Sequence, residues 1–164
     1  MYTVFMKKNG LATVGIILLL LLAGPSLISA QTAESIDQIL EEDRVSFGAA
    51  AYLLLVAEGE IGDDTGFETA GERFQRMYPS FAGWDVEGSL SLGEFSYLLM
   101  RSAGESGGLL YRFFPGPRYA VRELAFQKVV QRDPYPNAAI SGEEALRILE
   151  RFITMKDTEE DRES

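Results

Sequence analysis

Three stretches of the chain decide its fold: VSFGAAAYLL at residues 45–54, LSLGEFSYLL at residues 90–99 and ISGEEALRIL at residues 140–149. Aligned without gaps, at offsets of 45 and 50 residues, each begins with an apolar residue and a serine and continues with apolar residues at helical spacing. The second and third stretches also share an upstream segment, FQRMY at residues 74–78 and FQKVV at residues 126–130. The repeating unit is therefore helix, loop and helix, and such a unit cannot bury its apolar face alone.

The repeats predict an all-α fold in which three helix-loop-helix repeats pack around a pseudo-threefold core. They should lie at about residues 34–57, 67–103 and 118–153, inside a domain that covers residues 31–154. The first helix of the third repeat is expected at about residues 119–131, because it follows the Pro-Gly-Pro sequence that precedes it.

Equivalent leucines should meet in the shared core. Leu54, Leu99 and Leu149 occupy the same position in the three aligned stretches. The first stretch is also the most apolar, since residues 49–57 carry no charge. We therefore expect the second helix of the first repeat to lie deepest in the core.

The serine in each stretch is expected to cap the helix that follows it. Ser91 and Ser141 are each followed three residues later by a glutamate, Glu94 and Glu144, which predicts a capping box. In that motif the hydroxyl accepts a backbone N–H of the helix, and the carboxylate accepts the N–H of the serine. Ser46 has no acid at the matching position, so only half of the motif is expected there.

Residues 1–30 are predicted to be a secretory signal peptide. Lys7 and Lys8 form a basic segment, residues 11–24 form an apolar run, and small residues leading to Ala30 supply a cleavage site. The expected localisation is the periplasm or cell surface after cleavage near Ala30. The alternative is an uncleaved membrane anchor, because the apolar segment has about the length that spans a bilayer. Pro25 interrupts that run and favours cleavage.

The charge of the chain limits its partners. There are 15 basic and 25 acidic residues, for a net charge of −10, and there is no cysteine. An acidic surface repels nucleic acid and anionic lipid, so we expect no nucleic-acid partner, and membrane contact only through the signal segment during export. The lack of cysteine excludes disulfides and a lipidated N-terminal cysteine. Residues 155–164 carry five acids, which predicts a disordered acidic tail.

The composition also removes most catalytic chemistry. With no histidine and no cysteine, the chain lacks the commonest general base, a thiolate nucleophile and nearly all zinc or iron ligands. A carboxylate-dependent hydrolase is the remaining catalytic alternative. Its densest acidic segment outside the tail, residues 58–68, lies on a glycine-rich linker that cannot hold two carboxylates at a fixed separation. We therefore predict a protein that is not an enzyme, with no catalytic residue and no cofactor.

The second and third stretches resemble the S-layer homology repeat, whose signature is Ile-Thr-Arg-x-Glu-Phe followed by small and apolar residues, two aliphatics and an arginine. LSLGEF at residues 90–95, with Arg101 further on, fits this signature. ISGEEA at residues 140–145, with Arg151 further on, fits it nearly as well. The resemblance covers roughly residues 35–152 and implies a secreted bacterial module of two helices that commonly occurs in threes around a pseudo-threefold axis.

The resemblance implies a function in the bacterial cell envelope. We expect a secreted or periplasmic, non-enzymatic binding or structural module whose partner is an envelope protein or a cell-wall component. The family's basic residue after the hydroxyl, which is associated with anionic wall glycan, is replaced here by Phe47, Leu92 and Gly142. The resemblance thus implies the fold more directly than it implies a wall polysaccharide as ligand.

The same segments also resemble EF-hand calcium loops. An EF-hand loop has oxygen ligands at positions 1, 3, 5, 9 and 12. A calcium-responsive binding module is therefore the second functional hypothesis. Each loop lacks a ligand that the other has, and prolines stiffen the second of the two. The candidate ligands are Asp85, Glu87 and Glu94 in one loop and Asp133, Asn137, Ser141 and Glu144 in the other.

Two apolar features outside the three aligned stretches have alternative interpretations. Trp84 is a candidate for stacking on a sugar ring, and the alternative is that it closes the edge of the core. The segment LLYRFF at residues 109–114 is too apolar for a free loop. It is expected to be a connector packed on the domain, and a ligand groove is the alternative.

The interpretation of the leader can be tested on the exported protein. If the leader is cleaved, mass spectrometry should find an N-terminus at Gln31 or within a few residues of it. Recovery of peptides that contain Lys7 from a membrane fraction would favour the uncleaved anchor instead.

Overall fold

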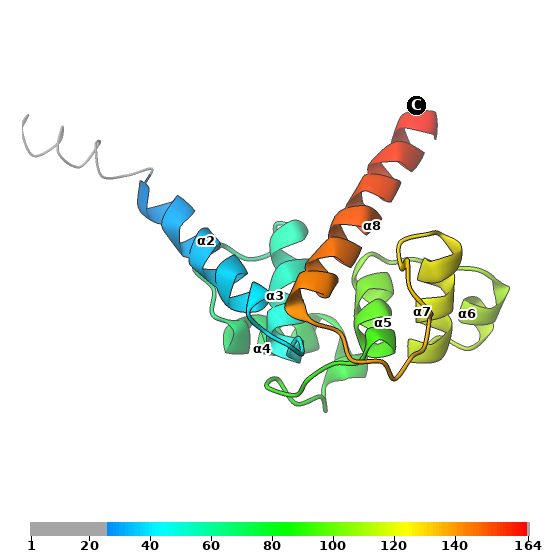
Figure 1. Ribbon diagram of the computed structural model, residues 1–164, viewed down its shortest axis with the longest axis horizontal. Coiled ribbons are helices and arrows are strands. Elements are labelled where there is room, and N and C mark those ends of the chain that lie inside the picture. The colour runs from blue at the N-terminus through cyan, green and yellow to red at the C-terminus, as the bar shows by residue number, and fades with distance from the viewer. Residues whose placement is uncertain (1–25, 164) are drawn as a thin grey trace, which may run out of the picture.

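The structure, a computed structural model, describes residues 26–163, and the described part of the chain is helical with no strand (Figure 1). The predicted all-α class is therefore confirmed. Its helices are α2 (Ser26–Leu40), α3 (Phe47–Ala57), α4 (Phe67–Met77), the 3-10 helix η1 (Pro79–Phe81), α5 (Leu92–Ser102), α6 (Leu109–Phe113), α7 (Pro117–Phe126) and α8 (Gly142–Glu163). Most of the predicted leader, residues 1–25, lies outside the described residues. Among the helices from α2 onward, none combines the length and the hydropathy needed to cross a bilayer.

Three pairs of helices are joined by loops, α2 to α3, α4 to α5 and α7 to α8. In each case the second helix packs against the first helix of another pair: α3 against α4, α5 against α7, and α8 against α2. Figure 1 shows α3 beside α4 and α5 beside α7. Each pair thus packs against helices of its neighbours.

Backbone hydrogen bonds join the loops to one another at the start of each second helix. The N–H of Phe47 donates to the carbonyl of Gly88 at 2.9 Å, and the N–H of Gly142 donates to Glu42 at 2.9 Å. Between them in the chain, the N–H of Leu92 donates to a carbonyl of the third loop, that of Ala138, at 2.8 Å. The first N–H groups of a helix have no partner inside the helix, so these carbonyls satisfy donors that would otherwise be buried and unpaired.

Two glycines allow these close approaches. A Cβ added to Gly48 would lie 2.8 Å from the carbonyl oxygen of Phe67, the first residue of α4. A Cβ added to Gly93 would lie 3.1 Å from the carbonyl oxygen of Pro117, the first residue of α7. Real Cβ atoms meet carbonyl oxygens at these distances only when the backbone shifts, so a larger residue would push the two helices apart.

Helix capping agrees with the sequence at α5 and at α3, where the hydroxyl of Ser46 accepts the Ala49 N–H at 3.2 Å, and it differs at α8. At α5 the capping box is complete, since the hydroxyl of Ser91 accepts the Glu94 N–H at 3.3 Å and the Glu94 carboxylate accepts the Ser91 N–H at 2.8 Å. At α3, Glu42 of the preceding turn supplies the missing acid and accepts the N–H of Ser46 at 2.7 Å. At α8 the predicted box is only half formed, because the carboxylate of Glu144 pairs with another residue.

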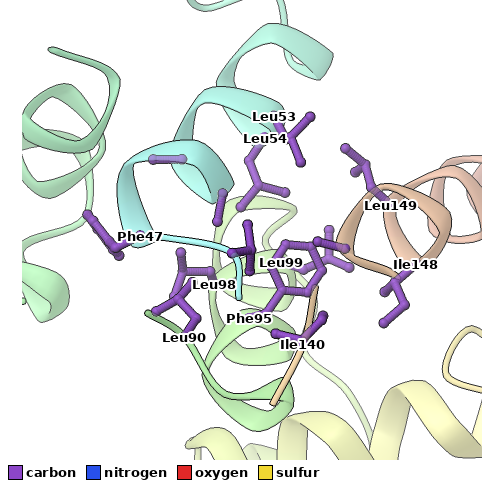
Figure 2. Close-up of a cluster of buried hydrophobic side chains, with 14 of the residues drawn as sticks. Phe47, Leu53, Leu54, Leu90, Phe95, Leu98, Leu99, Ile140, Ile148 and Leu149 are labelled. Carbon is purple, nitrogen blue, oxygen red and sulfur yellow. The ribbon is translucent and has the colours of Figure 1, made fainter. Parts of the chain in front are cut away.

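The core is built around α3. Every residue from Phe47 to Leu55 is buried, so α3 lies deepest, as predicted. Leu54 and Leu99 are 1% exposed and Leu149 is 7% exposed, and all belong to one hydrophobic cluster (Figure 2).

The structure differs from the sequence prediction at the ends of two helices. The first helix of the third pair, α7, ends at Phe126 and not near residue 131, because Lys128 adopts the left-handed backbone conformation (φ 64°) and turns Val129 and Val130 into the core. The predicted disordered tail after residue 154 is instead part of α8, which continues to Glu163. Lys156 anchors this extension through an ion pair with Glu105 at 2.7 Å.

Truncation of a central leucine tests the shared core. We expect Leu54→Ala or Leu99→Ala to lower the free energy of unfolding by about 2 to 5 kcal/mol, as cavity-forming changes do. Since one core serves all three helix pairs, urea unfolding should remain a single transition at a lower midpoint. Glu150→Ala is the matched control, because Glu150 is exposed on α8, and its effect should stay within about 0.5 kcal/mol. Equal stability of Leu99→Ala and Glu150→Ala would contradict the assigned helix faces.

Candidate functional site

Glu94, the candidate calcium ligand at the end of the second loop, forms part of the helix cap of α5. The carboxylate of Glu94 accepts both the N–H of Ser91, at 2.8 Å, and the hydroxyl of Ser91, at 2.7 Å. Asp85 accepts the N–H of Glu87 at 3.2 Å, which forms a local turn, and Glu87 itself is exposed. The carboxylates of Asp85 and Glu94 therefore serve local backbone structure.

In the third loop, an arginine stands where the EF-hand comparison would place a cation. The guanidinium of Arg132 contacts both carboxylate oxygens of Glu144, at 3.0 and 2.7 Å, and donates to the carbonyl of Ala139 at 3.4 Å. Counted from Asp133, these groups occupy positions 12 and 7 of the loop, which are ligands in an EF-hand. A positive charge from the chain itself thus neutralises the carboxylate that a calcium ion would need.

The other residues of the predicted calcium loops are not gathered into a metal site. Asp133 and Asn137 are exposed, and the hydroxyl of Ser141 accepts the backbone N–H of Glu144 at 3.2 Å as a helix cap. Within residues 26–163, no group of three or more acidic, histidine or cysteine side chains is arranged to hold a metal ion. The side-chain geometry therefore gives no support to either loop as a calcium site.

A polar pocket of about 320 Å³ lies over the first half of α8 and the loop before it. Its charges are paired: Arg132 with Glu144, and Arg147 with Glu143. The guanidinium of Arg151 donates to the carbonyl of Val129 at 3.4 Å. Its lining consists of Gln131, Arg132, Ser141, Glu143, Glu144, Arg147, Ile148 and Arg151. Such a set of donors and acceptors suits hydrogen bonding to a polar ligand.

A second pocket, of about 280 Å³, lies beside the start of α5 and includes Trp84, Ser89 and Glu94 in its lining. The ring of Trp84 packs against Phe81, with centroids 5.0 Å apart, and against Phe47, at 5.8 Å. Trp84 therefore closes the edge of the core and also lines a pocket, and its stacking on a sugar ring stays a prediction. Glu94 and Glu144, which are equivalent in the aligned stretches, are the one equivalent pair of residues that the two pockets share.

The acidic linker after α3 offers no catalytic pair. Glu60 forms an ion pair with Arg73 at 3.1 Å. The pKa of Glu58 is raised, first by desolvation and further by the nearby charge of Glu60, while a hydrogen bond from Ser102 opposes the shift. A single perturbed carboxyl next to a carboxylate bound by arginine does not supply the two positioned groups that hydrolysis needs.

The positions that carry the basic residue in S-layer homology repeats face inward here. Phe47 and Leu92 are fully buried, and a Cβ added to Gly142 would overlap the carbonyl of Ile39. A long basic side chain could not replace any of them without disturbing the core.

Sequence reasoning missed an exposed apolar surface on α6. Leu109, Leu110, Phe113 and Phe114 are between 60% and 73% exposed, whereas the expected packed connector would bury them. Only Tyr111 of this segment is buried, and its burial raises the pKa of the phenol to about 12. The signal in the sequence was the combination of aromatic and aliphatic residues with an arginine, which a core segment rarely contains.

Comparison with known proteins found no family model, no characterised protein and no solved structure that matches the chain.

The pairing of Arg132 with Glu144 predicts the response to calcium. Millimolar calcium should leave the melting temperature unchanged, because a ligand stabilises a protein only by binding its folded state, and the required carboxylate is already neutralised. Thermal unfolding with and without calcium measures this. A saturable rise in melting temperature that Glu144→Gln abolishes would instead favour the calcium-responsive module.

Proposed function

We propose that the protein is a secreted or periplasmic, non-enzymatic binding module of the bacterial cell envelope, and that its scaffold consists of three diverged repeats around a pseudo-threefold core. This combines the predicted leader, the resemblance to S-layer homology repeats and the contacts between the helix pairs. The partner class is an envelope protein or a cell-wall component.

The observation that carries the proposal is the recurrence of one contact between successive pairs. The N–H of Gly48 donates to Val86 at 2.8 Å, and the N–H of Gly93 donates to Pro136 at 2.9 Å. These donors are 45 residues apart and the acceptors 50 residues apart, which are the offsets of the sequence repeat. The same interface is thus used between the first and second pairs and between the second and third. The bond from Gly142 to Glu42 and the packing of α8 on α2 supply the closing link.

Binding fits the surface chemistry better than catalysis or calcium sensing. The chain has no histidine and no cysteine; the pocket over α8 displays paired charges and a hydroxyl group, and the pocket beside α5 displays carboxylates and a hydroxyl group. The ion pair between Arg132 and Glu144 argues against the calcium alternative, because Glu144 is one of the proposed calcium ligands. The hydrolase alternative needs two carboxylates held at a fixed separation, and in the acidic linker Glu60 is bound by Arg73.

The ligand contact should come from the pockets and not from the family's usual basic position, because that position is filled by Phe47, Leu92 and Gly142 inside the fold. The pocket over α8 offers two arginines, Arg147 and Arg151, beside acceptors and a hydroxyl. Charged and neutral hydrogen-bonding groups at one site suit a polar glycan or peptide of the wall.

Co-sedimentation with purified cell-wall sacculi tests the proposal. The exported protein should pellet with sacculi, and Arg147→Ala should weaken the affinity by roughly tenfold, since a hydrogen bond to a charged group is worth about 1.5 to 3 kcal/mol. Arg76→Ala is a closely matched control, because Arg76 forms an ion pair with Glu72 at the same spacing but on α4. That variant should bind as the parent does. Absence of the parent from the pellet, or equal losses in both variants, would contradict wall binding through this pocket.

A further inference from the structure

We propose that α6 docks the protein on an anionic lipid bilayer. The docking surface, called here the α6 face, consists of Leu109, Leu110, Phe113 and Phe114, which are 73%, 60%, 72% and 62% exposed. Four large apolar side chains on so short a segment form the kind of exposed patch that marks an interaction site.

The α6 face is a single stripe with a fixed orientation. Residues i, i+1 and i+4 of a helix share one side, so Leu109, Leu110 and Phe113 point the same way, and Phe114 follows directly at the C-cap. Tyr111 points inward and is 4% exposed, and it seats the helix on the domain. Gly107, with φ 55°, brings the chain in so closely that an added Cβ would lie 2.8 Å from the ring of Tyr111. The buried tyrosine thus holds the apolar stripe toward solvent.

The charge around the α6 face is opposite to that of the whole chain. Residues 106–131 contain four basic residues and one acid, in a protein whose net charge is −10. Arg112, Arg118 and Arg122 are exposed. In the described part of the chain, none of these three forms an ion pair with a carboxylate. Unpaired arginines beside exposed leucine and phenylalanine are the combination with which a peripheral segment binds an anionic membrane surface.

Charge also favours lipid over a second copy of the chain as the occupant. If two α6 faces met, Arg112 and Arg118 of both copies would be brought together, and like charges at an interface oppose association. An anionic bilayer offers phosphate groups to the arginines and an acyl boundary to the apolar stripe at the same time. The net negative charge of the chain led us to expect repulsion from anionic lipid. Salt screens this repulsion beyond a Debye length of about 8 Å, so the local basic surface dominates at contact.

Access to a flat surface is compatible with the position of α6. In Figure 1, α6 lies at one end of the long axis and α2 lies toward the other end. The membrane contact does not require a wall ligand, because none of its residues lines the pocket over α8. Binding to sacculi and binding to vesicles can therefore succeed or fail separately.

A fluorescent label on the α6 face tests the proposal with the full chain. The chain has no cysteine, so Leu110→Cys creates a unique site for an environment-sensitive dye, and Thr69→Cys on α4 gives an exposed control site. Vesicles of phosphatidylglycerol and phosphatidylcholine should shift the emission of the dye at position 110 to the blue, with saturation. Phosphatidylcholine vesicles should not produce this shift, and the dye at position 69 should not respond to either. Because the signal is local, it is informative whether or not the leader is retained.

Two further variants of the labelled chain separate the contribution of the apolar stripe from that of the arginines. Phe113→Ser with Phe114→Ser should remove the blue shift, because the acyl contact is lost. Arg118→Gln with Arg122→Gln should weaken the apparent affinity by roughly 25-fold, at about fivefold for each arginine near an anionic surface. Unchanged far-ultraviolet circular dichroism confirms that each variant is folded, since all four residues are exposed.

Several results would overturn the proposal. These are no shift with anionic vesicles, an equal shift with neutral vesicles, or a shift that survives the serine substitutions. A blue shift without vesicles that grows with protein concentration would assign the α6 face to a second copy. A blue shift without vesicles that is independent of protein concentration would mean that another segment of the same chain covers the α6 face.

Discussion

The close contact between the start of each second helix and a neighbouring loop is the constraint on which the rest of the structure depends. Gly48 donates to Val86 at 2.8 Å, and Gly93 donates to Pro136 at 2.9 Å. At both places an added Cβ would collide with a backbone carbonyl. Because the first N–H groups of a helix need partners from outside it, separating two pairs would leave buried donors unpaired. These backbone contacts fix the positions of the helices, and the leucine side chains pack between helices placed in this way.

The same contacts explain why the loops do not behave as ion-binding loops. The carbonyls of Pro136 and Ala138 accept N–H groups of the neighbouring pair, so part of the third loop is used to join the pairs. Arg132 then satisfies Glu144, whereas in the second loop Glu94 turns back to its own helix cap. Two loops of similar sequence thus use their equivalent glutamates differently, because only the third has an arginine within reach.

Much of the fold could be predicted because its determinants are local and repeated. Serine caps and apolar spacing placed α3 and α5 closely, and the repeat offsets align the glycine contacts. The rest depended on tertiary partners. The early end of α7 requires the left-handed Lys128, and the extension of α8 requires Lys156 to meet Glu105, a residue far away in the sequence. The exposure of the α6 face was missed for the same reason, since an apolar segment does not itself indicate whether a partner covers it.

The two candidate surfaces differ in a way that bears on what each can bind. In the pocket over α8, Arg132 and Arg147 already have carboxylate partners, so a ligand must exchange for an existing ion pair and gains little from charge alone. Such a pocket selects by the arrangement of its hydrogen bonds. Beside the α6 face, Arg112, Arg118 and Arg122 are exposed, and no carboxylate of residues 26–163 pairs with them. Their attraction to an anionic surface is therefore not offset by a lost ion pair, and it adds to the burial of the apolar stripe. Selective recognition and non-selective surface attachment would thus reside on different parts of one small domain.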